Sequence, residues 1–197
     1  MTFSLRSLLP LLPVFLASTA ASAKVAVDLS KGKNTVEFHA VGKPSFLKIN
    51  GEDEDKKGLS GTITKDGDKY TGEAVFKMAV MTTGLDLRDK HMKEKYLQVD
   101  KFPEAKLAIT KLPWGKDDTS DFDGKKGPFE GTFTLHGVTK PVTGEAEVTR
   151  DGKTIEAEVK FTIKVTDFGI DIPSFQGVTV ADTVDVDVNI KSPVVGG

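Results

Sequence analysis

Apolar and polar residues alternate one by one along most of the chain, which is the pattern of β-strands with one buried and one exposed face. The clearest run is residues 154–165, in which Ile, Ala, Val and Phe alternate with Glu, Lys and Thr. Turns such as KDGDKY and RDGKT supply Gly where a hairpin needs positive φ. The pattern predicts strands at residues 25–29, 34–41, 58–65, 69–78, 105–111, 128–135, 140–149, 154–165 and 183–191.

Antiparallel strands of this kind form either a two-sheet sandwich or a closed barrel. A barrel removes the exposed edges that a sandwich leaves behind. The interior of an eight-stranded barrel is just wide enough for side chains or for one slender ligand. The expected inward set also contains Gly61, Gly72, Gly131 and Gly144. These glycines either let the sheet bend or leave room inside it, and periodicity does not decide between the two.

The alternation stops at residues 82–105, where charges of both signs follow a helical period instead. Asp86 is the predicted N-cap of a helix over residues 87–99, and Asp89 lies in its first turn, where a negative charge suits the helix dipole. His91 lies beside the face that carries the apolar stripe. The residues expected on that face are Arg88, Met92, Tyr96 and Val99.

The first 23 residues have the features of a secretory signal peptide. A short start with one positive charge precedes the apolar run LLPLLPVFLA and the small-residue sequence ASA. Cleavage is predicted after Ala23, which leaves residues 24–197 as one exported domain that is periplasmic or secreted. The apolar run is too short to span a bilayer, so no stable membrane span is expected. The chain has no cysteine, which excludes a lipoprotein anchor, disulfides and thiolate catalysis.

The charged residues give no sign of a nucleic-acid partner. The formal net charge is −2, and the lysines are scattered rather than gathered into a stripe. The mixed-charge segment GEDEDKKG, residues 51–58, is typical of a solvated loop.

Catalytic and metal-binding motifs are not found in the sequence. There is no GxSxG, HExxH or Walker sequence, and the three histidines lack the short spacing of a structural metal site. Residues 119–130 resemble a calcium loop, but Thr119 replaces the first Asp and Pro128 interrupts the segment, so a flexible acidic turn is expected. We therefore predict no enzymatic activity, no cofactor and no metal.

Apolar binding is the remaining chemistry. Phenylalanines on the apolar faces of different strands would meet if the sheet closed, although periodicity does not distinguish a packed core from a lined pocket. The candidate tunnel residues are Phe38, Ile63, Phe76, Met78, Leu107, Ile109, Phe133, Leu135, Val159, Phe161, Ile163, Val186 and Val188.

Five segments resemble the YceI-like family of secreted polyisoprenoid-binding proteins: TTGLDLRDKHM, YLQVDKFPEAKLAI, GTFTLHGVTKPVTGEAEV, FTIKVTDFGI and VADTVDVDVNI. The resemblance implies an all-β fold, a lipocalin-like eight-stranded antiparallel β-barrel with one short helix inserted near residues 87–99. It also implies a tunnel that holds an isoprenoid quinone, a polyprenyl phosphate or a fatty amide. Two departures are the lack of Trp in the first strand and Val165 in place of a basic residue.

Polar residues that match the family signature are candidates for the mouth of the tunnel, either as head-group contacts or as braces for the helix. They are Arg88, Asp89, His91, His136 and Asp167. The expected function is that of a carrier for an isoprenoid or another long-chain lipid. The alternative is a stress-related structural or interaction protein whose barrel is filled by side chains. The oligomeric state is open, and a homodimer is among the alternatives.

Overall fold

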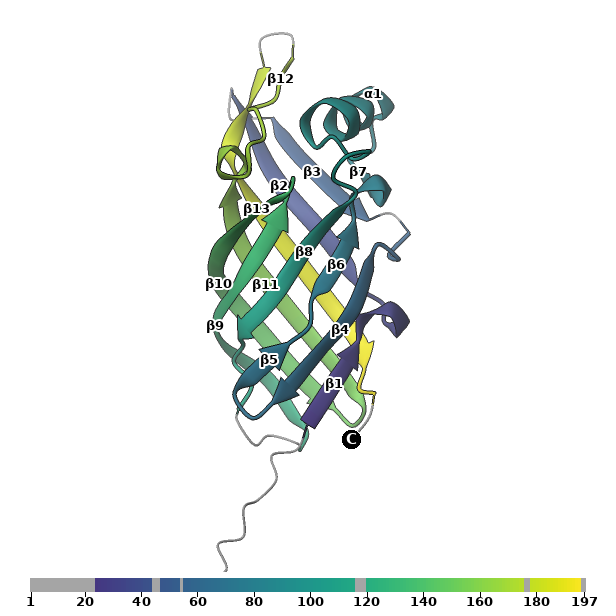
Figure 1. Cartoon of the computed structure of the whole chain (residues 1–197), viewed down its shortest axis with the longest axis vertical. Coiled ribbons are helices and arrows are strands. Elements are labelled where there is room, and N and C mark those ends of the chain that lie inside the picture. The colour runs from purple at the N-terminus through teal and green to yellow at the C-terminus, as the bar shows by residue number, and fades with distance from the viewer. Residues whose placement is uncertain (1–23, 44–46, 54, 116–119, 176–177, 196–197) are drawn as a thin grey trace, which may run out of the picture.

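A computed structural model describes residues 24–43, 47–53, 55–115, 120–175 and 178–195. The predicted signal peptide lies outside these residues. The described residues form one sheet of thirteen strands, and every pairing between named strands is antiparallel. The sheet curls into a barrel-like wall, with α1 and β12 at one end and β1 and β5 near the other (Figure 1).

The strands are short on one side of the barrel and long on the other. In chain order they are β1 (Lys24–Asp28), β2 (Thr35–Lys43), β3 (Lys48–Asp53), β4 (Leu59–Asp66), β5 (Lys69–Thr71), β6 (Ala74–Lys77), β7 (Met81–Thr82), β8 (Glu104–Lys111), β9 (Phe122–Leu135), β10 (Val138–Asp151), β11 (Thr154–Lys164), β12 (Ser174–Phe175) and β13 (Val178–Pro193). The helical segments are η1 (Leu29–Lys31), η2 (Met78–Val80), α1 (Asp86–Lys90), the π-helix η3 (His91–Tyr96) and η4 (Val165–Phe168).

The strands follow the order β1-β4-β6-β8-β9-β10-β11-β13-β2-β3-β7. The chain beyond β13 returns to β1, where Val194 is bridged to Val27 and the Val195 N–H donates to the Ala26 carbonyl over 2.7 Å. These contacts join β1 to the end of β13, so the wall curls back on itself at that end. The all-β antiparallel prediction is confirmed in this barrel-like form.

The strand count exceeds the predicted eight because one expected strand is interrupted and because β3, β7 and β12 lie outside the predicted strand ranges. The strand predicted at residues 69–78 is split into β5 and β6 at Gly72, which has a φ of 94°. A β-carbon at Gly72 would lie 2.0 Å from the Thr62 carbonyl oxygen, so this residue permits a bend and a close backbone approach. Gly61, with a φ of 111°, also bends the backbone. At these two positions the glycines serve the curvature of the wall.

Two segments predicted as loops or turns are strands in the structure. Residues 51–53, expected in a solvated loop, end β3, and Asp53 is only 1% exposed. Alternation was hidden there because Gly51 and Asp53 occupy inward positions. Residues 122–127, expected in a flexible turn, begin β9 and pair with β10, ahead of the strand predicted at residues 128–135. Pairing to a neighbouring strand supplies their backbone hydrogen bonds, which a local sequence pattern does not reveal.

The predicted helix is present but shorter and differently built. Helical structure runs over residues 86–96 rather than 87–99, and Leu85, not Asp86, is the N-cap, without a side-chain capping bond. Its second half is a π-helix, in which the Leu97 N–H reaches back five residues to the Met92 carbonyl at 2.9 Å. Such turns are rare and widen the helix locally.

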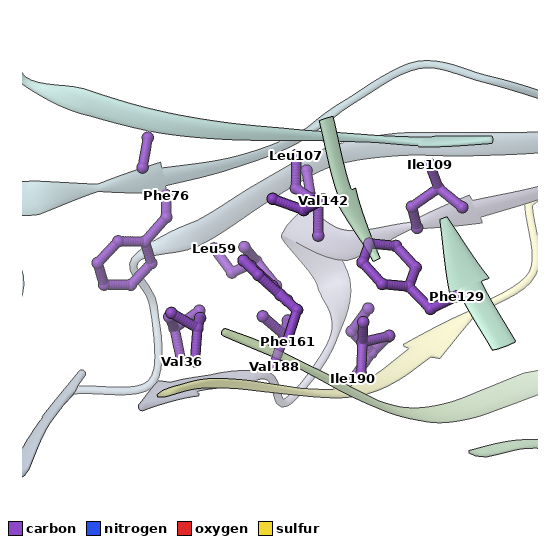
Figure 2. Close-up of a cluster of buried hydrophobic side chains, with 14 of the residues drawn as sticks. Val36, Leu59, Phe76, Leu107, Ile109, Phe129, Val142, Phe161, Val188 and Ile190 are labelled. Atoms are coloured by element: carbon purple, nitrogen blue, oxygen red, sulfur yellow. The ribbon is translucent and has the colours of Figure 1, made fainter. Parts of the chain in front are cut away.

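Inward-facing side chains of the long strands fill the part of the barrel nearer β1. Figure 2 shows buried side chains pointing toward one another from different strands. Ile109, Phe129 and Ile190 belong to this packed part, whereas Val36 and Phe76 line the hollow part nearer the helix. Phe129 is fully buried, and Val148 is equally inaccessible. This half of the barrel is a packed core, as the strand alternation predicts.

Candidate functional site

The half of the barrel beneath the helix is hollow. It contains a cavity of about 650 Å³, a size typical of small-molecule sites. Its wall is built by side chains of β2, β3, β4, β6, β7, β8, β9, β11 and β13 together with residues of α1 and η3. The lining is almost entirely aliphatic and aromatic, so the cavity suits an apolar occupant rather than a polar substrate.

Aromatic rings separate the cavity from the packed core. Phe161 and Phe133 line the cavity, and their ring centroids lie 5.3 Å apart in an edge-to-face arrangement. Behind them, Phe129 stands 5.8 Å from Phe161 and does not reach the cavity. Edge-to-face packing holds such rings in a defined orientation, so Phe161 and Phe133 form an aromatic pair in the cavity wall.

Ten of the thirteen candidate tunnel residues line this cavity: Phe38, Phe76, Met78, Leu107, Phe133, Leu135, Phe161, Ile163, Val186 and Val188. Ile63 and Ile109 instead line a much smaller cavity of about 30 Å³ near the other end. Val159 is 1% exposed and lines neither cavity, because it belongs to the packed core. Strict alternation placed all thirteen on the inner face, but it carried no information on depth along the barrel.

The end opposite the helix is plugged by a polar and aromatic cluster. The ammonium of Lys65 donates to the Gly67 carbonyl over 2.8 Å and lies 5.5 Å from the centre of the Trp114 ring. Tyr70 lies beside the same small cavity, and its hydroxyl has no hydrogen-bond partner among the described atoms. Burial, with a smaller effect of the Asp68 charge, raises the pKa of Tyr70 to about 12.

The helix is attached to the barrel through Asp89 and Arg88. The Asp89 carboxylate accepts hydrogen bonds from the Thr82 hydroxyl at 2.6 Å, from the Thr83 N–H at 2.8 Å and from the Thr83 hydroxyl. Burial by itself raises the pKa of Asp89, but these hydrogen bonds outweigh it and hold the pKa below its usual value. Asp89 is therefore an anchor for the helix and not part of the cavity wall.

Arg88 lines the cavity and is held in place by Thr83. Its Nε donates to the Thr83 hydroxyl at 2.7 Å, and its Nη2 donates to the Thr83 carbonyl at 2.6 Å. Arg88 thus braces the helix through Thr83. The same contacts keep a positive charge at the cavity wall, so bracing and ligand contact do not exclude each other.

The other mouth candidates lie in three places: the cavity wall, a partly buried position beside it and the outer surface. His91 lines the cavity beside Arg88. His136 does not, because its Nδ1 lies 3.2 Å from the Phe168 carbonyl and its ring centroid lies 4.3 Å from that of Phe102. Asp167 is exposed and outside the cavity lining. His136 thus connects the β9–β10 turn to η4.

Several cavity residues were not anticipated from the sequence. Ile49 and Leu47 belong to or adjoin β3, whose alternation was masked by glycine and aspartate. Leu97 lines the cavity because the π-helix brings residues five apart onto one face, whereas an α-helical period separates them. Leu85 and Leu87 reach the cavity from the start of the helix, and nothing in the local pattern placed them there.

Two further features of the described part of the chain concern metal ions and membranes. No cluster of three or more His, Asp or Glu side chains is arranged there to hold a metal ion. Within the same residues, no helix has both the length and the apolar character needed to cross a membrane.

Comparison with known proteins identifies one family. The model of the YceI-like domain matches residues 20–192. A UPF0312 protein of Pseudomonas putida (strain W619) is 29% identical over 185 residues, which covers 89% of this chain and 88% of the relative. A UPF0312 protein of Pseudomonas syringae pv. tomato is 28% identical over the same length and with the same coverage.

Two solved structures share the fold. A polyisoprenoid-binding domain from Saccharophagus degradans superposes with a TM-score of 0.66 at 16% identity, over 89% of this chain and 99% of that one. BcnA of Burkholderia cenocepacia superposes with a TM-score of 0.63 at 20% identity, over 84% and 98% of the two chains.

Proposed function

Because this chain belongs to the YceI-like domain family, we propose that it binds a long-chain apolar molecule in the barrel cavity and carries or sequesters it. The proposed ligand class is an isoprenoid quinone, a polyprenyl phosphate or a fatty amide. The polyisoprenoid binding named for the Saccharophagus degradans domain supports the isoprenoid among these. The proposed location is the periplasm or the exterior, on the basis of the signal sequence in residues 1–23.

The observation that carries this proposal is a cavity of about 650 Å³ walled by apolar side chains. Proteins seldom keep large voids in their cores, because each void forfeits dispersion contacts and hydrophobic burial. A barrel that only needed a stable core would be filled at both ends. The hollow half therefore favours a ligand site over the alternative of a side-chain-filled structural protein.

Burial of the apolar chain would supply the binding free energy. At about 25 cal/mol per Å², removing about 300 Å² of tail from water gives roughly 7 kcal/mol before the costs of association. Arg88 and His91 stand on the wall near the helix, where they would contact the polar end of such a ligand. Binding of this kind requires no turnover and no cofactor.

Extraction of the native protein tests the ligand directly. Protein purified from its own compartment is extracted with organic solvent and analysed by mass spectrometry. We expect a prenyl or acyl lipid at close to one molecule per chain. Repeated extractions without any such lipid, together with failure of the purified protein to bind an apolar dye, would refute the proposal.

A matched pair of variants on β8 tests the location of the ligand. Ala105 faces the cavity, whereas Ala108 lies on the outer face of the same strand. Ala105→Phe should fill part of the cavity and lower the lipid content of the purified protein severalfold. Ala108→Phe should leave it unchanged. Equal lipid content in both variants would place the ligand outside the cavity.

The proposed export is tested by sequencing the N-terminus of the protein in a periplasmic fraction. Cleavage after Ala23 gives an N-terminus at Lys24. An uncleaved chain retained in the cytoplasm would contradict this part of the proposal.

A further inference from the structure

Large apolar side chains are exposed at four positions among the residues whose burial the structure describes. Leu85 and Leu87 are each 58% exposed, Val41 is 42% exposed and Ile172 is 40% exposed. We call these four residues the apolar rim. Single exposed apolar residues are common on protein surfaces, so their meaning depends on whether they lie together.

All four rim residues lie at the helix end of the barrel. Leu85 and Leu87 stand at the start of α1, and Ile172 lies just before β12, which Figure 1 places at the same end. Val41 lies near the end of β2, next to Gly42, which is paired with Val180 of β13. A hydrogen bond ties the segment of Ile172 to the strand beside Val41, since the Val180 N–H donates to the Pro173 carbonyl at 2.8 Å.

The apolar rim is continuous with the cavity wall. Leu85 and Leu87 line the cavity and are also exposed, so each belongs to both surfaces. On the opposite side, Pro173 and Val180 line the cavity next to Ile172 and the strand that carries Val41. An apolar ligand that left the barrel between these residues would therefore cross an apolar surface.

Charge near the rim is mixed. Asp86 lies between the two rim leucines, Asp171 precedes Ile172, and Lys48 is paired with Val41. These three charges sum to −1, and Arg88, which follows Leu87, offsets this, so the rim does not select a strongly charged partner. The rim therefore suits a partner that takes up apolar side chains at its surface with water.

We propose that the apolar rim docks on a lipid bilayer, inserting its four side chains into the interface so that the cavity opens toward the acyl chains. The inference rests on the proposed function. A long apolar ligand resides in membranes, and its passage through water costs about 25 cal/mol for each Å² exposed. Docking removes that cost, because the tail moves from the bilayer into the cavity along the rim.

A tryptophan probe tests whether the rim enters the interface. The native Trp114 is buried in the plug at the other end, and it is the single tryptophan of the chain. Leu87→Trp is mixed with phosphatidylcholine vesicles, and Lys153→Trp, exposed in the turn between β10 and β11, is its control. We expect a blue shift in emission for Leu87→Trp alone. No shift, or equal shifts in both proteins, would overturn the proposal.

A second variant separates docking from ligand binding. Val41 and Ile172 belong to the rim but do not line the cavity, so a Val41→Ser/Ile172→Ser protein keeps the wall intact. We expect its sedimentation with phosphatidylcholine vesicles to weaken about tenfold relative to wild type, with little dependence on salt. Its binding of the apolar dye N-phenylnaphthylamine without vesicles should be unchanged.

The outcomes distinguish the two proposals. Wild-type protein that binds the dye but not the vesicles overturns membrane docking and leaves the proposed function in place. Protein that binds vesicles, but neither binds the dye nor yields a lipid on extraction, overturns the proposed function. A wild-type dimer that the Val41→Ser/Ile172→Ser variant abolishes would assign the rim to a second copy of the chain and would also overturn membrane docking.

Discussion

The hydroxyl of Tyr96 meets the backbone of Ser174 across the open end of the barrel. It lies 3.4 Å from the Ser174 carbonyl, to which it donates, and it accepts from the Ser174 N–H at 3.3 Å. Both residues line the cavity. The contact links the end of η3 to β12, so the helix is fastened to the barrel on two sides: by Tyr96 at one end and by Asp89 near the other.

Removing this link should speed the exchange of ligand. Tyr96→Phe loses the hydroxyl contacts, each contributing about 1 kcal/mol at most, and keeps the ring against the cavity. We expect dye release, followed by stopped-flow fluorescence, to accelerate severalfold while equilibrium affinity changes less than about tenfold. The chain has two tyrosines, so Tyr70→Phe at the plugged end is the matched control. A release rate unaffected by Tyr96→Phe would show that the contact does not restrain the mouth.

Loss of the Asp89 carboxylate should loosen the helix. Asp89→Ala removes the acceptor for three hydrogen bonds from Thr82 and Thr83, and we expect a local loss of about 1–2 kcal/mol. Hydrogen exchange of residues 84–97 measures it, because opening of the helix exposes those amides. Unchanged protection in the variant would mean that packing alone holds the helix.

The lowered pKa of Asp89 predicts an acid-sensitive attachment. A depressed folded-state pKa stabilises the native protein fully above the ordinary Asp value of 3.8, and this contribution is lost as pH falls through the lower folded-state pKa. Protection of residues 84–97 should therefore decrease below about pH 4 in the wild type. Asp89→Asn, which cannot ionise, should show a flatter profile over that window, and identical profiles would contradict the assignment.

Tyr70 should make the protein sensitive to alkali. Its folded-state pKa is raised to about 12 from the ordinary value of 10.0, because burial disfavours the phenolate. The neutral form is therefore favoured by folding, and the associated stability is fully present below pH 10.0 and lost as pH rises toward 12. The melting temperature of Tyr70→Phe should fall less steeply with rising pH in that range than the melting temperature of the wild type. Parallel curves would contradict this.

A small change at Gly51 should alter the cavity. A β-carbon there would lie 2.1 Å from Cε1 of Phe38, which lines the cavity wall. Gly51→Ala must therefore displace the Phe38 ring, and we expect weaker dye binding, by about tenfold, in a fluorescence titration. Asn50→Ala, on the outer face of the same strand, is the control. Equal affinities would show that the ring moves without entering the cavity.

Much of the barrel could be predicted because the alternation of apolar and polar residues within each long strand identifies its buried and its exposed face. β11 and β13 follow the alternation of residues 154–165 and 183–191 closely. β3 could not be found in this way, since glycine and aspartate occupy two of its inward positions. Gly51 leaves room for the ring of Phe38, and Asp53 accepts from the Gly58 N–H at 2.6 Å, so both depend on partners distant from the local pattern.

The amino-acid sequence by itself determined the antiparallel wall, the inward set of side chains and the helical insertion, because these follow from local period and turn chemistry. Only the tertiary structure decided how far along the barrel each inward residue lies. Val159 and Phe161 obey the same alternation, yet one is sealed in the core and the other faces the cavity. That difference comes from how the barrel is capped: Trp114 and Lys65 plug one end, while the π-helix stands over the other and leaves space beneath it.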